Sequence, residues 1–135
     1  MLEKIPPQNI DAEQSVLGAI LIDREAIYKV MKLLQPGDFY RDSHRIIYET
    51  MLALNESGRP VDLITLCEEL KQQDRLDKVG GVAYIATLAA TVPTAANVEY
   101  YAHIVEEKSL LRTLINLSTR IASMGYEENE EPEKL

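Results

Sequence analysis

Apolar side chains recur every three to four residues along most of this sequence, which is the spacing of amphipathic helices. Neither strand-like alternation nor an internal repeat is present in the sequence. The spacing predicts helices over residues 10–22, 24–32, 43–57, 62–73 and 82–91, and one long helix within 93–126. We therefore expect an all-α domain, with a compact head of about five to six helices followed by a long C-terminal helix.

Polar residues and glycines mark where the predicted helices begin and end. Asn9, Asp23 and Asp62 stand where an N-cap side chain would accept a backbone N–H. Gly125 suits the C-terminal end of the long helix. Gly18 lies inside the first helix, where it costs roughly 1 kcal/mol relative to alanine. We expect a close helix crossing at Gly18, because such a crossing would explain that cost.

The long helix changes its apolar face near Lys108 and Ser109, by roughly half a turn. Its apolar residues are Val98, Tyr101, Ala102 and Val105 before this point, and Leu110, Leu111, Leu114, Ile115, Leu117, Ile121 and Ala122 after it. A straight helix with this pattern packs its two halves against two different bodies. The alternative is a kink near Ser109, which would return both faces to one core.

Length and charge limit the classes of function. The chain has 135 residues, which fits one domain, and 46% of them are hydrophobic, enough for a substantial core. It carries 22 acidic and 14 basic residues, a net charge of −8. A chain this acidic repels a phosphate backbone, so we expect little direct nucleic-acid binding.

Cys67 is the only cysteine, so no internal disulfide can form, as suits a reducing cytoplasm. We expect it to be a core thiol rather than a nucleophile, because no base stands out near it. No apolar run is long enough to span a membrane, and the N-terminus lacks the apolar core of a signal peptide. These features predict a cytoplasmic protein.

Catalytic and metal-binding motifs are absent from the sequence. It contains no P-loop, no dinucleotide-binding glycine pattern, no zinc-ligand spacing and no nucleophile elbow. Of the two histidines, His103 is expected on an exposed face, and His44 is expected to cap or pack rather than catalyse. The residues alone therefore indicate a binding or assembly module without a catalytic centre, metal or cofactor.

Six segments, in order, resemble the N-terminal domain of bacterial replicative DNA helicases of the DnaB family. They are I-P-P-Q-N-I-D-A-E-Q-S-V-L-G-A at 5–19, D-F-Y at 38–40, H-R-I-I-Y at 44–48, P-V-D-L-I-T at 60–65, G-G-V-A-Y at 80–84 and V-P-T-A-A-N-V-E-Y-Y-A-H-I-V-E-E-K at 92–108. Each segment alone would be a weak signal, but the ordered set is specific and covers nearly the whole chain.

The resemblance implies a collar domain of a hexameric helicase. Residues 1–108 would form the head, 109–126 the first arm of a helical hairpin, and 127–135 an acidic, disordered end. Hairpins would pair into a trimer of dimers in the bacterial cytoplasm, at the replication fork. ATP and Mg²⁺ would belong to a C-terminal motor that this sequence does not include.

The resemblance also implies interaction residues. Arm pairing would use Leu110, Leu111, Leu114, Ile115, Leu117 and Ile121. The C-terminal helicase-binding domain of primase would contact Tyr84, Ile115 and Ile121, and a helicase loader is a further expected partner. Alternatively, Tyr84 fills the core and the isoleucines only pair arms. The helix up to Lys108 would pack on the predicted helices at 10–22, 43–57 and 82–91.

Three other functions compete with this hypothesis. A stand-alone helical adaptor, for example a loader-like protein, could use the same fold to bind replication proteins. A single-strand DNA-binding domain is opposed by the net charge of −8. A small enzyme has no supporting constellation of residues. A reading frame that continues past Leu135 into a P-loop domain would separate the helicase from the adaptor.

Overall fold

The structure is a computed structural model that describes residues 4–127 and Glu133. Within this part of the chain all regular elements are helical, which confirms the predicted all-α fold. They are α1 (Ile10–Ile22), α2 (Ala26–Met31), η1 (Pro36–Asp38), α3 (Asp42–Glu56), α4 (Leu63–Gln72), η2 (Asp77–Val79), α5 (Gly81–Thr91) and α6 (Val98–Glu127). Here η denotes a short 3₁₀ helix.

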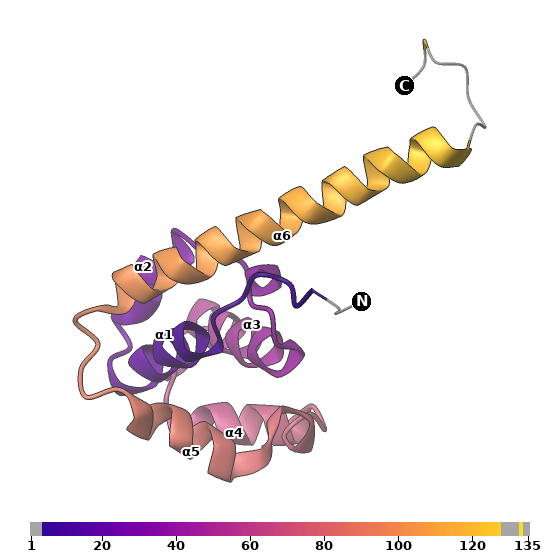
Figure 1. Ribbon diagram of the computed structural model, residues 1–135. Helices are drawn as coiled ribbons and strands as arrows, with labels where there is room; N and C mark the ends of the chain where they lie inside the picture. Colours follow the sequence, from indigo (N-terminus) through magenta and orange to yellow (C-terminus); the bar gives the residue numbers. More distant parts are fainter. Residues whose placement is uncertain (1–3, 128–132, 134–135) are drawn as a thin grey trace.

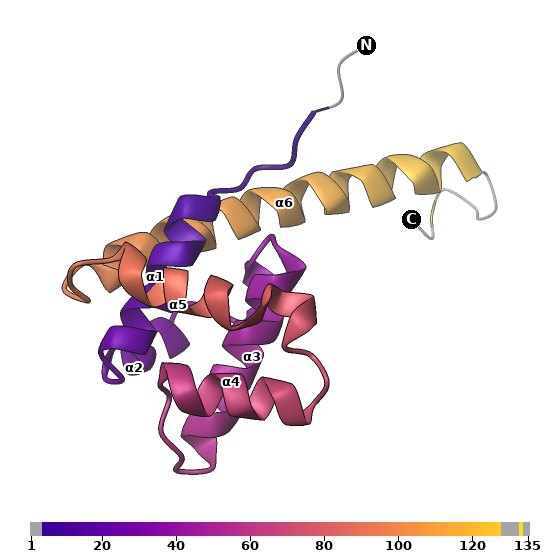
Figure 2. The same cartoon turned by 90° about the horizontal axis from the view of Figure 1, so that it is seen from below.

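The helices form layers with α1 near the centre (Figure 1). Helix α6 lies along one side of α1, and α5 and α4 lie on the opposite side. The first part of α6 packs on α1, α2 and η1. The prediction that it packs on the helices at 10–22, 43–57 and 82–91 is confirmed for the first of these. Helix α2 and η1 take the place of the other two as its principal neighbours, and α1 separates α6 from α5. The rest of α6 projects past the head, as Figure 2 also shows.

Helix α1 is buried on a face that α5 crosses closely. Val16, Leu17 and Ile20 are fully buried along this helix. A Cβ atom on Gly18 would overlap the backbone carbonyl of Leu88 in α5. Only glycine permits this approach, so the expected close crossing is confirmed and the cost of Gly18 is explained.

Two predicted N-caps are confirmed. The Asn9 side chain accepts a hydrogen bond from the backbone N–H of Ala12 at 2.9 Å, and Asp62 accepts one from Thr65 at 2.8 Å. The bond from the Thr65 backbone favours the ionised carboxylate, so it lowers the pKa of Asp62. Asp62 thereby fixes the start of α4.

Two predicted boundaries are wrong. Asp23 does not cap α2, which begins at Ala26; its carboxylate accepts the N–H of Glu25 in the preceding turn. Gly125 does not end α6, which continues to Glu127. A single glycine costs a helix only about 1 kcal/mol, so it does not by itself stop one. The predicted acidic end at 127–135 lies outside the described residues, apart from the helical Glu127 and from Glu133.

Candidate functional site

Helix α6 is one element with two different surroundings. It runs without interruption from Val98 to Glu127, so the structure excludes a kink at Ser109 that would return its outer half to the head (Figure 1). Val98, Ala102 and Val105 are buried, and no residue from 106 to 127 is. The head therefore covers only the first turns of this helix.

The outer half of α6 carries an exposed apolar stripe, which we call the arm stripe. Its members are the six residues predicted for arm pairing, Leu110, Leu111, Leu114, Ile115, Leu117 and Ile121, all 43% to 68% exposed. Met124 and Tyr126 are also exposed and extend the same outer half, although the sequence did not single them out. Apolar residues gathered on one side of a helix in this number indicate a surface for another protein.

Ile115 lies at one edge of the arm stripe, on the side of the helix that faces the head. It lines a cavity of about 520 Å³ at the base of the arm, together with Lys4, Ile5, Pro6, Tyr40, Arg45, Arg112 and Asn116. The arm stripe therefore continues, through Ile115, into a hollow formed with the N-terminal segment.

Polar contacts hold α6 to the head just beyond its last buried residue. The Ser109 hydroxyl donates to the Asp38 carboxylate at 2.6 Å. The Arg112 guanidinium donates to the carbonyl oxygens of Pro7, at 2.7 Å, and of Asp38, at 2.6 Å, and lies over the Tyr40 ring. These contacts fix the direction in which the arm leaves the head, and they reach one turn past the predicted boundary at Lys108.

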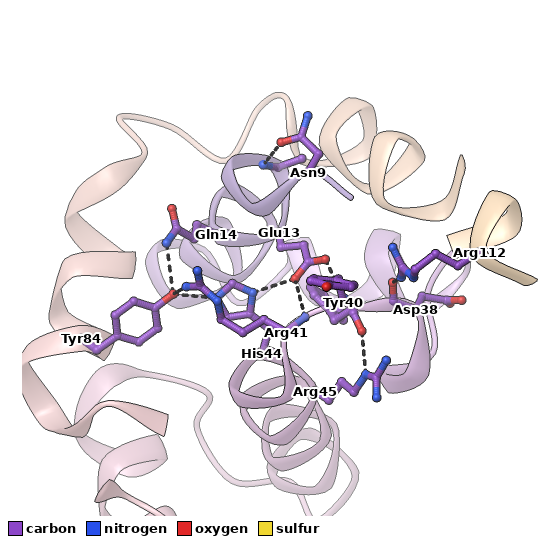
Figure 3. Close-up of polar contacts among 12 residues, drawn as sticks. Asn9, Glu13, Gln14, Asp38, Tyr40, Arg41, His44, Arg45, Tyr84 and Arg112 are labelled. Atoms are coloured by element: carbon purple, nitrogen blue, oxygen red, sulfur yellow. Dashed lines mark hydrogen bonds and ion pairs between the residues drawn. The ribbon is translucent and has the colours of Figure 1, made fainter. Parts of the chain in front are cut away.

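A buried polar cluster, next to these contacts, holds α1, α3 and α5 together (Figure 3). Glu13 and His44 are 1% and 0% exposed, and Glu13 Oε1 lies 2.8 Å from His44 Nδ1. The same carboxylate accepts the backbone N–H of Tyr40 at 2.7 Å. Glu13 thus satisfies backbone next to the start of α3, where Arg41 provides no side-chain cap.

The hydrogen bonds of this cluster engage both nitrogens of the His44 ring. Glu13 can only accept when ionised, so His44 Nδ1 donates to it. The Tyr84 hydroxyl lies 2.6 Å from His44 Nε2 and receives N–H donors from Gln14 and Arg41 at 3.1 and 3.2 Å. Both nitrogens of the His44 ring therefore have a hydrogen-bond partner. Glu13, His44 and Tyr84, with Gln14 and Arg41, thus form one connected network of hydrogen bonds, which we call the clasp.

The clasp bears on the two roles predicted for Tyr84, contact with primase and packing in the core. Its hydroxyl is occupied inside the head, while its ring is half-buried on α5. Figure 3 shows Tyr84 and Arg112 on opposite sides of Glu13 and Tyr40, and Figure 1 shows α1 between α5 and α6. The structure therefore does not bring Tyr84 together with Ile115 and Ile121 in one patch.

Sequence reasoning missed the clasp, although a signal was present. Glu13 stands three, four and seven residues before Val16, Leu17 and Ile20, so it continues the buried stripe of α1. A carboxylate on a buried stripe requires partners. The prediction that His44 caps or packs fits its buried place, and His103 lies on an exposed face as expected.

Neither a metal-binding group of side chains nor a helix able to span a membrane is found in the described part of the chain. No group of three or more His, Cys, Asp or Glu side chains among residues 4–127 could hold a metal ion. Among the helices that the structure describes, none combines the length and the hydropathy needed to cross a membrane.

Comparison with known proteins finds close sequence relatives. Residues 5–107 match the family described as DnaB-like helicase N terminal domain. The chain is 53% identical to the replicative DNA helicase DnaC of Bacillus subtilis (strain 168) over 133 residues, which cover 98% of this chain and 29% of that protein. The chain thus spans less than a third of the length of this curated relative.

Solved structures share the fold. The crystal structure of the N-terminal domain of DnaB helicase from Mycobacterium tuberculosis matches with a TM-score of 0.87 and 48% identity, over 90% of this chain and 88% of that one. The structure of a DnaB-like replicative helicase, described with its interactions with primase, matches with a TM-score of 0.77 and 31% identity. This second match covers 85% of this chain and 27% of that one.

Proposed function

Since the matched family spans residues 5–107, this chain belongs to the DnaB-like helicase N-terminal domains, and we propose that it is the collar through which a replicative helicase assembles and recruits primase. The observation that carries this proposal is the arm stripe on the outer half of α6. ATP-driven DNA unwinding would belong to the remainder of such a protein, which would also bind ATP and Mg²⁺. This chain would contribute the surfaces for assembly and for primase.

Self-association is the first part of the proposal. Leu110, Leu114, Leu117 and Ile121 follow one another at helical spacing along one side of α6, and each is at least half exposed. Ser109 and Arg112 attach the opposite side of the helix to the head, which leaves this side open. Two such arms would bury their stripes against each other, as helices do in a bundle.

Analytical ultracentrifugation of matched variants tests this pairing. Ile121→Asp places a charge inside the arm stripe, whereas Ser123→Asp places the same charge on the other side of the same turn. The chain should form dimers or higher assemblies, and Ile121→Asp should weaken association at least about tenfold, because an unpaired carboxylate would be buried. Ser123→Asp should associate like the parent chain. A monomer at all concentrations, or equal weakening by both variants, would refute arm pairing.

Primase recruitment is the second part. Its support is the similarity to a replicative helicase described with its interactions with primase. We assign the contact to the predicted residues Ile115 and Ile121 on the arm and Tyr84 on the head. Because Tyr84 lies apart from the isoleucines, primase would have to touch two places on the collar, either on one chain or on neighbouring chains.

Binding of the C-terminal domain of primase, measured together with the melting temperature, separates contact from packing. At a protein concentration low enough for the arms to be unpaired, Ile121→Ala should weaken binding about tenfold without changing the melting temperature, because exposed anchors contribute to an interface and not to the core. Tyr84→Phe should lower stability by freeing His44 Nε2, yet keep binding if the ring is the contact. Unchanged binding for Ile115→Ala, Ile121→Ala and Tyr84→Ala would rule out the proposed contact.

A further inference from the structure

A second concave apolar surface is lined by α4, by residues 74–77 around the start of η2, and by Val82 in the first turn of α5. Helices α4 and α5 lie on the side of the head away from α6 (Figures 1 and 2). We call this surface the α4–α5 groove. It has a volume of about 550 Å³, and its apolar lining consists of Leu63, Ile64, Cys67, Leu76 and Val82. This volume falls in the range of pockets that enclose a ligand or a few side chains of a partner.

The apolar lining is not needed for the core. Helix α4 already buries Leu66 and Leu70 completely on its inner face. Ile64 and Val82, on the two walls of the groove, are nevertheless 81% and 52% exposed. A single exposed aliphatic side chain needs no explanation. Two of them flanking a hollow lined by half-buried aliphatic residues form a contiguous surface that can bind another apolar face.

The rim of the groove is acidic. Its charged lining comprises three carboxylates, Glu68, Asp74 and Asp77, and one ammonium group, Lys71. This local excess has the same sign as the net charge of −8 of the whole chain. A second acidic copy of the chain would be repelled, whereas a segment rich in Lys or Arg would be attracted.

We propose that the α4–α5 groove binds a basic amphipathic helix of another protein, with its apolar side chains on Ile64, Cys67 and Val82 and its cations on the acidic rim. An apolar groove between two helices is suited to a short helix, whose anchors recur at positions i, i+3, i+4 and i+7. The site is separate from the arm stripe, so arm pairing would leave it open.

Cys67 provides a direct measurement because it is the only thiol in the chain and lines the groove. Burial raises the pKa of the Cys67 thiol, so its alkylation is followed at mildly alkaline pH. The probe is a synthetic helical peptide of about four turns, with Leu on one face and Lys on the other. Saturating peptide should slow alkylation of Cys67 at least about fivefold, since the occupied groove excludes the reagent.

Charge-neutral substitutions test the apolar contact. Ile64→Asn should weaken the affinity of the peptide about tenfold, as measured by its protection of Cys67 from alkylation. This loss corresponds to the lost burial of one aliphatic side chain. Tyr100→Asn is the matched control, because Tyr100 is 68% exposed on α6, away from the groove. It should leave the affinity unchanged, and so should Ile121→Asp on the arm. Neither Ile64 nor Tyr100 supports the core, so both variants should fold.

Charge substitutions test the rim. Glu68→Gln should weaken binding about threefold, and Glu107→Gln, an exposed acid of α6, should not. A peptide with Glu in place of Lys should fail to protect Cys67. The proposal is overturned by equal protection from both peptides, by no protection from the Lys peptide, or by equal affinities of Ile64→Asn and Tyr100→Asn. Protection that grows with protein concentration alone would instead make the groove a contact between copies.

Discussion

The two halves of α6 share one backbone helix but differ in what surrounds them. The inner half buries Val98, Ala102 and Val105 on α1 and α2. The outer half exposes Leu110, Leu114 and the rest of the arm stripe. The inner half is stabilised by packing within the chain, whereas the outer half presents a comparable apolar face with no cover in the described structure.

This difference shows that helix formation and helix packing are separate questions. Isolated helices of about 12–15 residues are marginal in water, and most helical stability in proteins comes from packing of an apolar face. The inner half satisfies that requirement alone. The outer half satisfies it only when another surface covers it, so its order should depend on assembly.

An aspartate introduced into each half of α6 tests this difference most strongly. Val105→Asp should destabilise the domain by about 3–5 kcal/mol, because it buries an unpaired carboxylate at a residue that is 1% exposed. Leu114→Asp should change the stability of the monomer by less than about 0.5 kcal/mol. Chemical denaturation at low protein concentration measures both. Similar losses for the two variants would mean that the halves do not differ as described.

Glycines in the head and in the arm should respond with opposite signs. Gly18→Ala forces a Cβ against the Leu88 carbonyl and should cost about 1–3 kcal/mol. Gly125→Ala meets nothing within 4 Å and should stabilise the outer half of α6 by roughly 0.5–1 kcal/mol. Thermal unfolding of the first variant and helical content of the second provide the readouts. A stabilised Gly18→Ala would show that α1 and α5 are not in close contact.

The boundary between the halves should respond only modestly to substitution. Arg112→Met removes the donors to the Pro7 and Asp38 carbonyls and should cost about 1 kcal/mol, since the site is only partly buried. Arg120→Met, at an exposed position of the arm, should be neutral. Amide exchange of the first arm turns should accelerate in the Arg112 variant only. Unchanged exchange there would mean that the polar contacts do not set the arm direction.

Local signals predicted much of this fold. Side chains able to cap, at Asn9 and Asp62, sit at the observed helix starts because capping depends on neighbours three residues away. The shift of the apolar face at Lys108 and Ser109 separated the buried half of α6 from the exposed half, because the helical period is fixed. The predicted partners of the arm residues remain predictions.

Contacts between residues far apart in the sequence could not be predicted from such local signals. The clasp joins Glu13, His44 and Tyr84 across 31 and 40 residues, and no local pattern specifies which buried polar groups will meet. The packing of α6 on α2 instead of on α3 and α5 likewise follows from the arrangement of layers around α1. The predicted helix end at Gly125 is wrong because a weak helix breaker stops a helix only with help from its surroundings.

Amide hydrogen exchange along α6, measured over a range of protein concentrations, tests the central claim most directly. Protection of residues 98–109 should be independent of concentration, because the head itself covers this half. Protection of residues 110–127 should rise with concentration, and the rise should vanish in Ile121→Asp. Protection of 110–127 that is strong and concentration-independent, in the parent chain and in Ile121→Asp alike, would contradict the account.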